Sequence, residues 1–386
     1  MGGLTRKAAI AGVYEYPTRN DPTVSENAIQ ALSAKKALED AGLDIKDVDG
    51  LMSPMGMGLL QVAEYMGLNP DLVDTTQVGG SSYQLHVARA TAAIAAGQAN
   101  CIVITYGSIA RSSARAIGTG GRNMAKPNAI ESFEVPYGGI LAGMYAMVKN
   151  RHMYEFGTKD EQFANISVIT RRHAGLNPEA MFRDPITIDD VLSSRVIAHP
   201  LHLLECCIVS DGGGAVVVVS PELARSIKKK PVWVLGEGEG YAHLANGKRD
   251  WVPTGAAQSG KTAFAHAGIT HKDIDHARIY DSFTITVLTA LEDLGFCKKG
   301  EGGAFVEGNR LAIDGDLPMN TDGGGLSSNH PGMRGLFLIV EAVKQLRQDY
   351  KGTERQVPGD PKISIAHGTG GMLGSRHASV TLLLGV

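Results

Sequence analysis

Several apolar runs along the chain consist almost entirely of β-branched and aliphatic residues. A strand with one solvated face alternates apolar and polar side chains, whereas these runs do not, so both faces of each predicted strand are expected to be covered. Segments with helical periodicity and glycine stops lie between them, which indicates an α/β fold. The runs are CIVITYG (101–107), AVVVVS (215–220), VWVLGEGEG (232–240), KISIAHG (362–368) and SVTLLLGV (379–386).

The sequence repeats itself over a long period. Residues 37–53 (ALEDAGLDIKDVDGLMS) and 263–281 (AFAHAGITHKDIDHARIYD) align without a gap. Each copy predicts a helix that ends at a glycine, a short acidic turn and an apolar strand. A second pair of segments, 75–97 and 320–343, places a glycine-rich turn before a long apolar helix. The chain is therefore predicted to be a duplicated α/β unit.

The duplication divides the chain into an N-terminal half, residues 1–225, and a C-terminal half, residues 226–386. Residues 131–201 interrupt the alternation of strands and helices with helices and loops. Because these helices carry apolar stripes, we interpret the segment as an ordered cap over a site. The expected architecture is two mixed sheets with helices between and outside them, plus this cap.

Composition and charge narrow the possible partners. The chain has 386 residues, with Lys+Arg 37 against Asp+Glu 40, so its charge gives no reason to expect nucleic acid or a membrane surface. It lacks a recognisable targeting segment and any apolar run near the roughly 20 residues that span a bilayer, so we expect a cytoplasmic protein. The cysteines Cys101, Cys206, Cys207 and Cys297 show no metal-ligand spacing and are interpreted as core residues.

The stretch TTQVGGSSYQLHVARA (75–90) predicts a strand end, a glycine turn and the start of a helix. A turn of this kind can present a nucleophile, and Ser81 and Ser82 are the hydroxyls available there. A serine nucleophile requires an adjacent base, and no triad partner is evident nearby. The favoured interpretation is a serine pair that caps the helix. Ser82 and Tyr83 remain candidate pocket residues.

Motifs along essentially the whole chain resemble those of the thiolase superfamily, and more narrowly its sterol-carrier-protein thiolase and lipid-transfer-protein branch. The resemblance implies the five-layer αβαβα thiolase-like fold, with acyl-CoA chemistry at the junction of the two halves. The motifs are, in order, YGGILAGMYAM, RRHAGLNPEA, SDGGGAVVVVS, IYDSFT, NTDGGGLSSNHPG and AHGTGGMLGSRHASV.

The resemblance also locates the reactive thiols of the family, and this chain has none of them. The acylated cysteine falls on Val78, the second cysteine on Ser282, and the CxG motif on AHGTGG (366–371). The oxyanion histidine is retained as His330 in an Asn-His-Pro motif. This combination favours a reaction that passes through a thioester enolate without a covalent intermediate.

Retro-aldol cleavage of a 3-hydroxyacyl-CoA is such a reaction. Tyr280 followed by Asp281 resembles the thiolase-like aldolases of bacterial steroid side-chain degradation, which split a 17-hydroxylated C22 steroid CoA thioester into a 17-ketosteroid and propionyl-CoA. Tyr280 is therefore the candidate for proton transfer. Some of those aldolases carry a tyrosine where this chain has His330, so the division of acid and base roles between Tyr280 and His330 stays open.

Four further side chains are candidates near this site. His330 is expected at the start of a helix, where backbone N–H groups would help it bind an anionic oxygen. Asn329 is a candidate oxyanion or positioning group, and His367 a candidate second acid or base. Asp281 is interpreted as a carboxylate that stabilises a turn and orients a neighbour.

The resemblance implies partners as well as chemistry. It implies a homodimer joined to a smaller protein built from a zinc ribbon and an OB-fold, in an α2β2 assembly, with no metal or cofactor in this chain. Two other functions stay open: a thiolase-type acyltransferase with an unconventional nucleophile, and a non-catalytic acyl-CoA or lipid-binding scaffold. A scaffold would have no need of both Tyr280 and His330, so the pair favours the lyase.

Overall fold

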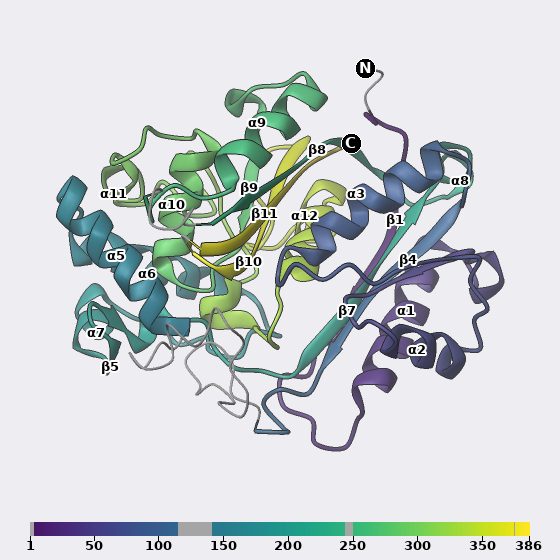
Figure 1. Ribbon diagram of the computed structural model, residues 1–386, viewed down its shortest axis with the longest axis horizontal. Helices are drawn as coiled ribbons and strands as arrows, with labels where there is room; N and C mark the ends of the chain where they lie inside the picture. The colour runs from purple at the N-terminus through teal and green to yellow at the C-terminus, as the bar shows by residue number, and fades with distance from the viewer. Residues whose placement is uncertain (1–3, 115–140, 244–249, 374) are drawn as a thin grey trace.

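The computed structural model describes residues 4–114, 141–243, 250–373 and 375–386. Within them, the long strands form one mixed nine-stranded sheet in the order β3-β2-β4-β7-β1-β8-β11-β10-β9 (Figure 1). The two expected sheets are joined into one, because β1 pairs with β8 through Ala9↔Trp233 and Ile10↔Val232. This ladder satisfies backbone groups that two separate sheet edges would leave unpaired.

The predicted apolar runs all lie in strands of this sheet, as expected. The first half contributes β1 (Ala9–Glu15), β2 (Gly50–Met52), β3 (Leu72–Asp74), β4 (Cys101–Ser108) and β7 (Gly212–Val219). The second half contributes β8 (Val232–Ala242), β9 (His276–Ile279), β10 (Ile363–Met372) and β11 (Ser375–Gly385).

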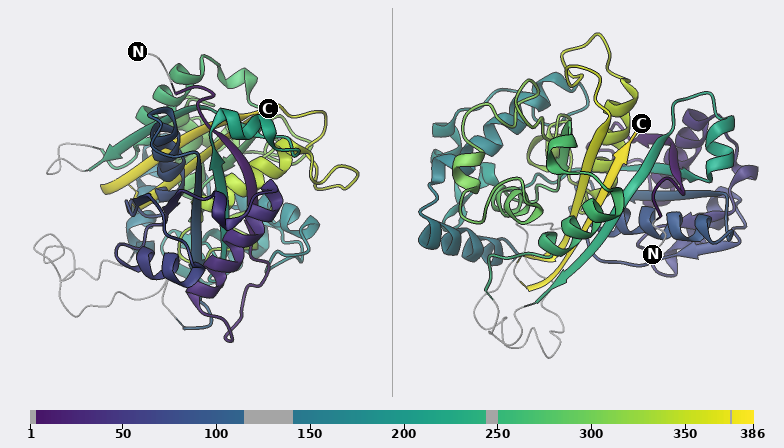
Figure 2. Two further views of the ribbon diagram at one scale, coloured as in Figure 1. Left: turned by 90° about the vertical axis from the view of Figure 1, so that its right-hand side faces the viewer. Right: turned by 90° about the horizontal axis from the view of Figure 1, so that it is seen from above.

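The two halves of the sheet, β3-β2-β4-β7-β1 and β8-β11-β10-β9, form two layers. Helices lie between them and outside each, which gives the expected five-layer arrangement (Figures 1 and 2). Separate apolar clusters fill the spaces between the layers. The outer layer of the first half is α1 (Glu26–Ala41) and α2 (Gly58–Met66), and the central layer is α3 (Ser82–Ala95) and α12 (Gly335–Arg347). The outer layer of the second half is α9 (Ala256–Ala267) and α10 (Thr284–Leu294).

The internal repeat is visible in the backbone. Helix α1 ends at Gly42 with φ 73°, and α9 ends at Gly268 with φ 67°. Both glycines adopt the left-handed conformation that closes a helix, which a residue with a Cβ rarely adopts. A short 3-10 turn follows each helix, at Ile45–Asp47 and His271–Asp273, and leads into β2 and β9 respectively.

Residues 141–201 of the predicted cap form α5 (Leu141–Phe156), α6 (Asp160–Leu176), α7 (Ile188–Ser193) and the hairpin of β5 (Val196–Ala198) and β6 (Leu201–His202). Residues 131–140 of that segment lie outside the described residues. Buried polar contacts hold α5 in place: Lys149 forms an ion pair with Glu205 at 2.8 Å, and Nε2 of His152 lies 3.0 Å from the Glu292 carboxylate of α10.

Shorter elements complete the described chain, and none of its helices is long and apolar enough to cross a membrane. The boundary between residues 225 and 226 would fall inside α8 and stays a prediction. The short elements are the 3-10 turn Leu203–Glu205, α8 (Pro221–Ser226), α11 (Gly302–Phe305) and a π-helical turn at Gly324–Ser328.

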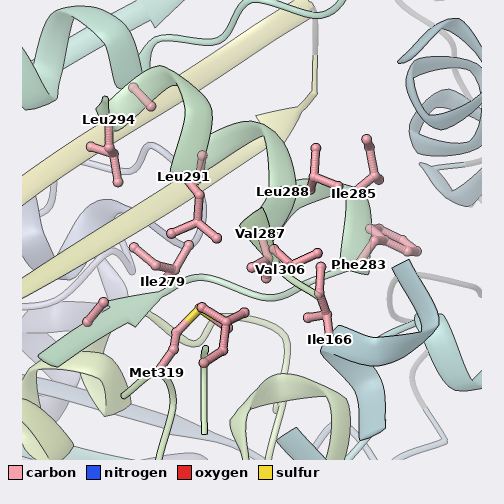
Figure 3. Packing of buried hydrophobic residues seen from close by; sticks show 14 of the residues in the cluster. Ile166, Ile279, Phe283, Ile285, Val287, Leu288, Leu291, Leu294, Val306 and Met319 are labelled. Atoms are coloured by element: carbon pink, nitrogen blue, oxygen red, sulfur yellow. The ribbon is translucent and has the colours of Figure 1, made fainter. Parts of the chain in front are cut away.

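An apolar cluster fixes the segment between β9 and α10 (Figure 3). Side chains from α10 pack around Ile279 at the end of β9, with Ile166 of α6 and Met319 completing the cluster. Ile279, Ile166 and Met319 are each at most 1% exposed. Packing therefore holds residues 280–283 at both ends, through Ile279 on one side and α10 on the other.

We expect Leu291→Ala, in this cluster, to lower the free energy of unfolding by about 2–5 kcal/mol, because it removes buried methyl groups and leaves a cavity. Leu291 is 0% exposed. The control Leu60→Ala changes a side chain that is 48% exposed and should stay within about 0.5 kcal/mol of wild type. Denaturant unfolding measures both, and equal losses would contradict the packing described.

Candidate active site

A cavity of about 310 Å³ lies where the two halves and the cap meet. The glycine turn of the first half, helix α5, the segment after β9, the loop before α12 and the end of β10 each contribute to its wall. The lining residues are Gln77, Gly79, Gly80, Leu141, Tyr145, Cys207, Tyr280, Ser282, Phe283, His330, Gly332, Met333, Thr369, Gly370 and Gly371.

Tyr280 and His330, which the sequence predicts to act together, are in direct contact in this cavity. The Tyr280 hydroxyl oxygen lies 3.0 Å from Nε2 of His330, with the two rings nearly perpendicular at 88°. The backbone N–H of Arg334 also donates to that hydroxyl oxygen, at 3.1 Å. Tyr280 itself extends the β9–β10 ladder, because its N–H donates to the His367 carbonyl at 3.0 Å. Tyr280 is thus held by hydrogen bonds at its backbone and at its hydroxyl group.

His330 does not stand at the start of a helix, contrary to the prediction, because α12 begins only at Gly335. The intervening loop is held instead by side chains of the first half. The His330 N–H donates to the Ser210 hydroxyl at 3.0 Å, and the Tyr106 hydroxyl donates to the Pro331 carbonyl at 2.6 Å. The imidazole is therefore positioned by contacts across the junction of the two halves.

A buried guanidinium organises the residues around this pair. Arg334 is 0% exposed; it forms a hydrogen-bonded ion pair with Asp322, donates to the side chain of Asn329, and places Nε 3.3 Å from Asp281. The Asn329 amide donates in turn to Glu15 of β1, at 2.5 Å. Asn329 and Asp281 thus lie behind the cavity wall, and neither is among its lining residues. Asp281 also accepts hydrogen bonds from the backbone N–H groups of Gly325 and Leu326, at 2.8 and 3.3 Å.

Burial sets the protonation states of the pair. It raises the pKa of Tyr280 well above 10, so the phenol stays protonated. Burial, with the nearby charge of Arg334, lowers the pKa of His330 to about 3, so the imidazole stays neutral near pH 7. Burial also raises the pKa of Asp281 to about 6, although Arg334 and the Gly325 N–H oppose that shift. The site therefore pairs a neutral phenol with a neutral imidazole.

The glycine turn carries no nucleophile into the cavity. Ser81 donates to the Val78 carbonyl at 2.9 Å, while Ser82 donates to the Gly79 carbonyl and accepts from the Val78 N–H. Neither serine lines the cavity, and Ser81, the residue before α3, makes no side-chain capping bond to the helix. The serines stabilise the turn itself rather than cap the helix.

Two other candidates also lie away from the cavity. Tyr83 is fully buried against Tyr106, with ring centroids 5.3 Å apart. His367 is fully buried in β10 and places Nδ1 2.9 Å from the Thr381 hydroxyl. Neither residue is among the lining residues. His367 contacts Tyr280 through its backbone, because the His367 carbonyl accepts the hydrogen bond of the Tyr280 N–H.

Two lining residues were missed by the sequence analysis. Cys207 is buried as expected, but its side chain lines the cavity, where burial raises the pKa of the thiol above its usual range. Tyr145 of α5 lines the cavity as well, with its hydroxyl 3.3 Å from the Gly371 carbonyl. Tyr145 belongs to the motif YGGILAGMYAM, but no local pattern distinguishes it from other aromatic residues of the cap.

Among residues 4–114, 141–243, 250–373 and 375–386, no group of three or more His, Cys, Asp or Glu residues is placed to hold a metal ion.

Comparisons with known proteins agree with this architecture. Residues 238–383 match the family described as Thiolase C-terminal domain-like. A steroid side-chain-cleaving aldolase of Thermomonospora curvata is 36% identical to this chain, covering 96% of it and 97% of the relative. A 17-hydroxy-3-oxo-4-pregnene-20-carboxyl-CoA lyase of Mycobacterium tuberculosis is 34% identical, covering 95% and 97%. An acetyl-CoA acetyltransferase of Methanothermobacter thermautotrophicus is also 34% identical, covering 88% and 90%.

A solved structure is similar over the full length. The Ltp2-ChsH2(DUF35) aldolase superimposes with a TM-score of 0.89 at 33% identity, covering 99% of this chain and 98% of that chain. Relatives named as an aldolase, a lyase and an acetyltransferase are thus similar to this chain at comparable identity, so the chemistry of the site must distinguish between these functions.

We expect Gly80→Ala to destabilise the protein by about 1–3 kcal/mol, because overpacking forces buried groups apart. A Cβ at Gly80 would lie 2.3 Å from the Tyr280 ring and 2.6 Å from the Thr369 carbonyl oxygen. The control Gly58→Ala places its Cβ no closer than 3.6 Å to any neighbour and should not destabilise. Denaturant unfolding compares the two variants, and an unperturbed Gly80→Ala would show that the turn does not abut Tyr280.

We expect the His330 imidazole to remain neutral between pH 5 and pH 8, because its pKa is lowered to about 3. The unfolded chain binds the proton near pH 6.5, so the stability associated with His330 is present above that pH and is lost as the pH falls toward 3. Histidine-labelled ¹⁵N NMR measures the titration, with His330→Asn to assign the signal. Titration near pH 6.5 would contradict the buried, neutral imidazole.

Proposed function

The chain belongs to the thiolase superfamily, and within it we propose that it is a carbon–carbon lyase that cleaves a 3-hydroxyacyl-CoA by a retro-aldol reaction. The proposed substrate is a steroid side-chain CoA thioester of the 17-hydroxy C22 type, which yields a ketosteroid and propionyl-CoA. The observation that carries the proposal is the Tyr280–His330 contact of 3.0 Å in a cavity whose glycine turn holds Val78 instead of a nucleophile. Resemblance to the two aldolases supports the steroid substrate.

Proton removal begins at the 3-hydroxyl group. Tyrosinate is not available as a base, because burial keeps the Tyr280 phenol protonated. His330 is the acceptor within hydrogen-bond distance of the Tyr280 hydroxyl, and the negative charge that develops on the bound thioester would favour its protonation. In the proposed relay the substrate hydroxyl passes its proton to the Tyr280 oxygen while Tyr280 passes its own to Nε2 of His330. The relay requires the His330 tautomer with its hydrogen on Nδ1.

The C2–C3 bond then breaks, and its electron pair becomes the enolate of the thioester. Much of the cavity wall is glycine backbone, from Gly79, Gly80, Gly332, Gly370 and Gly371. Glycine allows backbone N–H groups to approach a thioester oxygen without an intervening Cβ, and donors placed where charge develops contribute most to catalysis. Asn329 contributes indirectly, because its amide is bound to Glu15 and Arg334.

Acyl transfer is the second candidate, because Cys207 places a thiol in the cavity wall. A cysteine nucleophile reacts as the thiolate, which positive surroundings favour. Burial, Cys206 and the Asp281 carboxylate instead raise the pKa of Cys207, so its thiol stays protonated. The electrostatic surroundings of Cys207 therefore favour the lyase over the acyltransferase.

We further propose that the chain acts as a homodimer together with a smaller OB-fold and zinc-ribbon protein. The Ltp2-ChsH2(DUF35) aldolase, which pairs an aldolase chain with a second protein, supports a complex of this kind. On this proposal any zinc belongs to the partner.

The test is to co-express the chain with its OB-fold partner and supply the 17-hydroxylated C22 steroid CoA thioester, following ketosteroid and propionyl-CoA by mass spectrometry. We expect both products from wild type and a loss of about 10²-fold or more in Tyr280→Phe, because the relay is broken. Tyr65→Phe removes a hydroxyl from a side chain that is 60% exposed and should retain full activity. An acyl adduct on Cys207, Ser81 or Ser82 without cleavage would support the acyltransferase, and CoA binding without turnover the scaffold.

A further inference from the structure

A second tyrosine lies in the wall of the Tyr280 cavity. Tyr145 projects from the cap helix α5 and is 3% exposed. Its hydroxyl lies 3.3 Å from the Gly371 carbonyl at the end of β10, and its ring packs on Phe283 with centroids 4.3 Å apart. Tyr280, in contrast, is held at the start of α12 by the Arg334 N–H. The two phenols are thus fixed to different parts of one wall.

Retro-aldol cleavage requires two proton transfers at different atoms. One proton leaves the 3-hydroxyl oxygen when the C2–C3 bond breaks, and the relay through Tyr280 places it on His330. A second proton must then reach C2 of the enolate before the shortened acyl-CoA is released. Tyr280 and His330 already take the proton from the oxygen on C3, so the proton for C2 requires a donor elsewhere in the cavity.

We propose that Tyr145 is the acid that protonates C2 of the enolate, an assignment that rests on the proposed lyase function. In this step the O–H bond of Tyr145 breaks as the C2–H bond forms. The resulting tyrosinate regains a proton from protonated His330 or from water, so the proton lost by the substrate hydroxyl balances the one gained at C2. Tyr145 would thus be a catalytic residue.

The surroundings of Tyr145 fit a proton donor. Burial raises its pKa to about 12, so it is protonated before the step, while the Ser282 hydroxyl opposes that shift and would stabilise the tyrosinate. Ser282 itself lies 3.0 Å from the Thr286 hydroxyl, which continues a chain of hydroxyl groups away from the cavity. Cys207 also lines the cavity and is the competing donor.

The test separates the two proton transfers in the co-expressed complex. Propionyl-CoA is incubated in D₂O without ketosteroid at rising pD, and exchange of its C2 hydrogens is followed by mass spectrometry. Exchange runs only the final step in reverse, and its base is the small tyrosinate fraction of Tyr145, which grows as the pD rises toward the raised pKa of that phenol. We expect exchange in wild type, a loss of about 10²-fold in Tyr145→Phe, and retention in Tyr280→Phe. Tyr154→Phe, on the same helix with a side chain 84% exposed, should exchange like wild type. Tyr145→Phe keeps the ring that packs on Phe283, and its thermal midpoint checks the fold.

A second readout uses cleavage of the steroid thioester in D₂O. Wild type should place one deuterium at C2 of propionyl-CoA in a single configuration, and Tyr145→Phe should cleave more slowly and give both configurations. Wild-type exchange in Tyr145→Phe, loss of exchange in Cys207→Ala alone, or mixed configurations from wild type would overturn the assignment. Absence of cleavage by wild type would instead overturn the lyase function, so the two failures are distinguishable.

Discussion

The buried guanidinium of Arg334 is the constraint on which the candidate site depends. It lies within contact distance of Asp281, Asp322 and Asn329, and its own backbone N–H holds the Tyr280 hydroxyl. Removing one partner of a buried ion pair leaves an uncompensated charge, at a cost of about 3–5 kcal/mol. The end of β9, the glycine-rich turn and the start of α12 therefore have to keep one relative position.

Through Asn329 this network reaches the first half of the molecule. The Asn329 amide binds Glu15 of β1, and Glu15 forms an ion pair with Arg19 at 2.5 Å. Ser210 and Tyr106, also from the first half, hold the loop that carries His330. The Tyr280–His330 pair consequently depends on contacts from both halves.

Burial of the ionisable groups in the cavity wall decides their protonation states. Burial disfavours every charged form in the wall, so Tyr280, Tyr145 and Cys207 keep their protons while His330 stays neutral. A set of neutral donors around one neutral acceptor suits transfer of protons to and from a bound substrate. The same burial keeps Cys207 in its thiol form, whereas acyl transfer requires the thiolate. The lyase proposal thus follows from electrostatics as well as from the missing thiols.

The amino-acid sequence by itself determined the local structure and identified Tyr280 and His330 as candidates, whereas their contact came from the tertiary structure. Neighbouring residues encode the apolar runs and the glycines at the ends of α1 and α9, and local sterics and burial are enough to specify these features. Neighbouring residues also form the motifs from which Tyr280 and His330 were identified. Tertiary structure decided what distant segments do together: the β1–β8 ladder, the supporting place of Asn329, the turn contacts of Ser82, and the entry of Cys207 and Tyr145 into the cavity. These depend on packing between segments far apart in the chain, which no local pattern records.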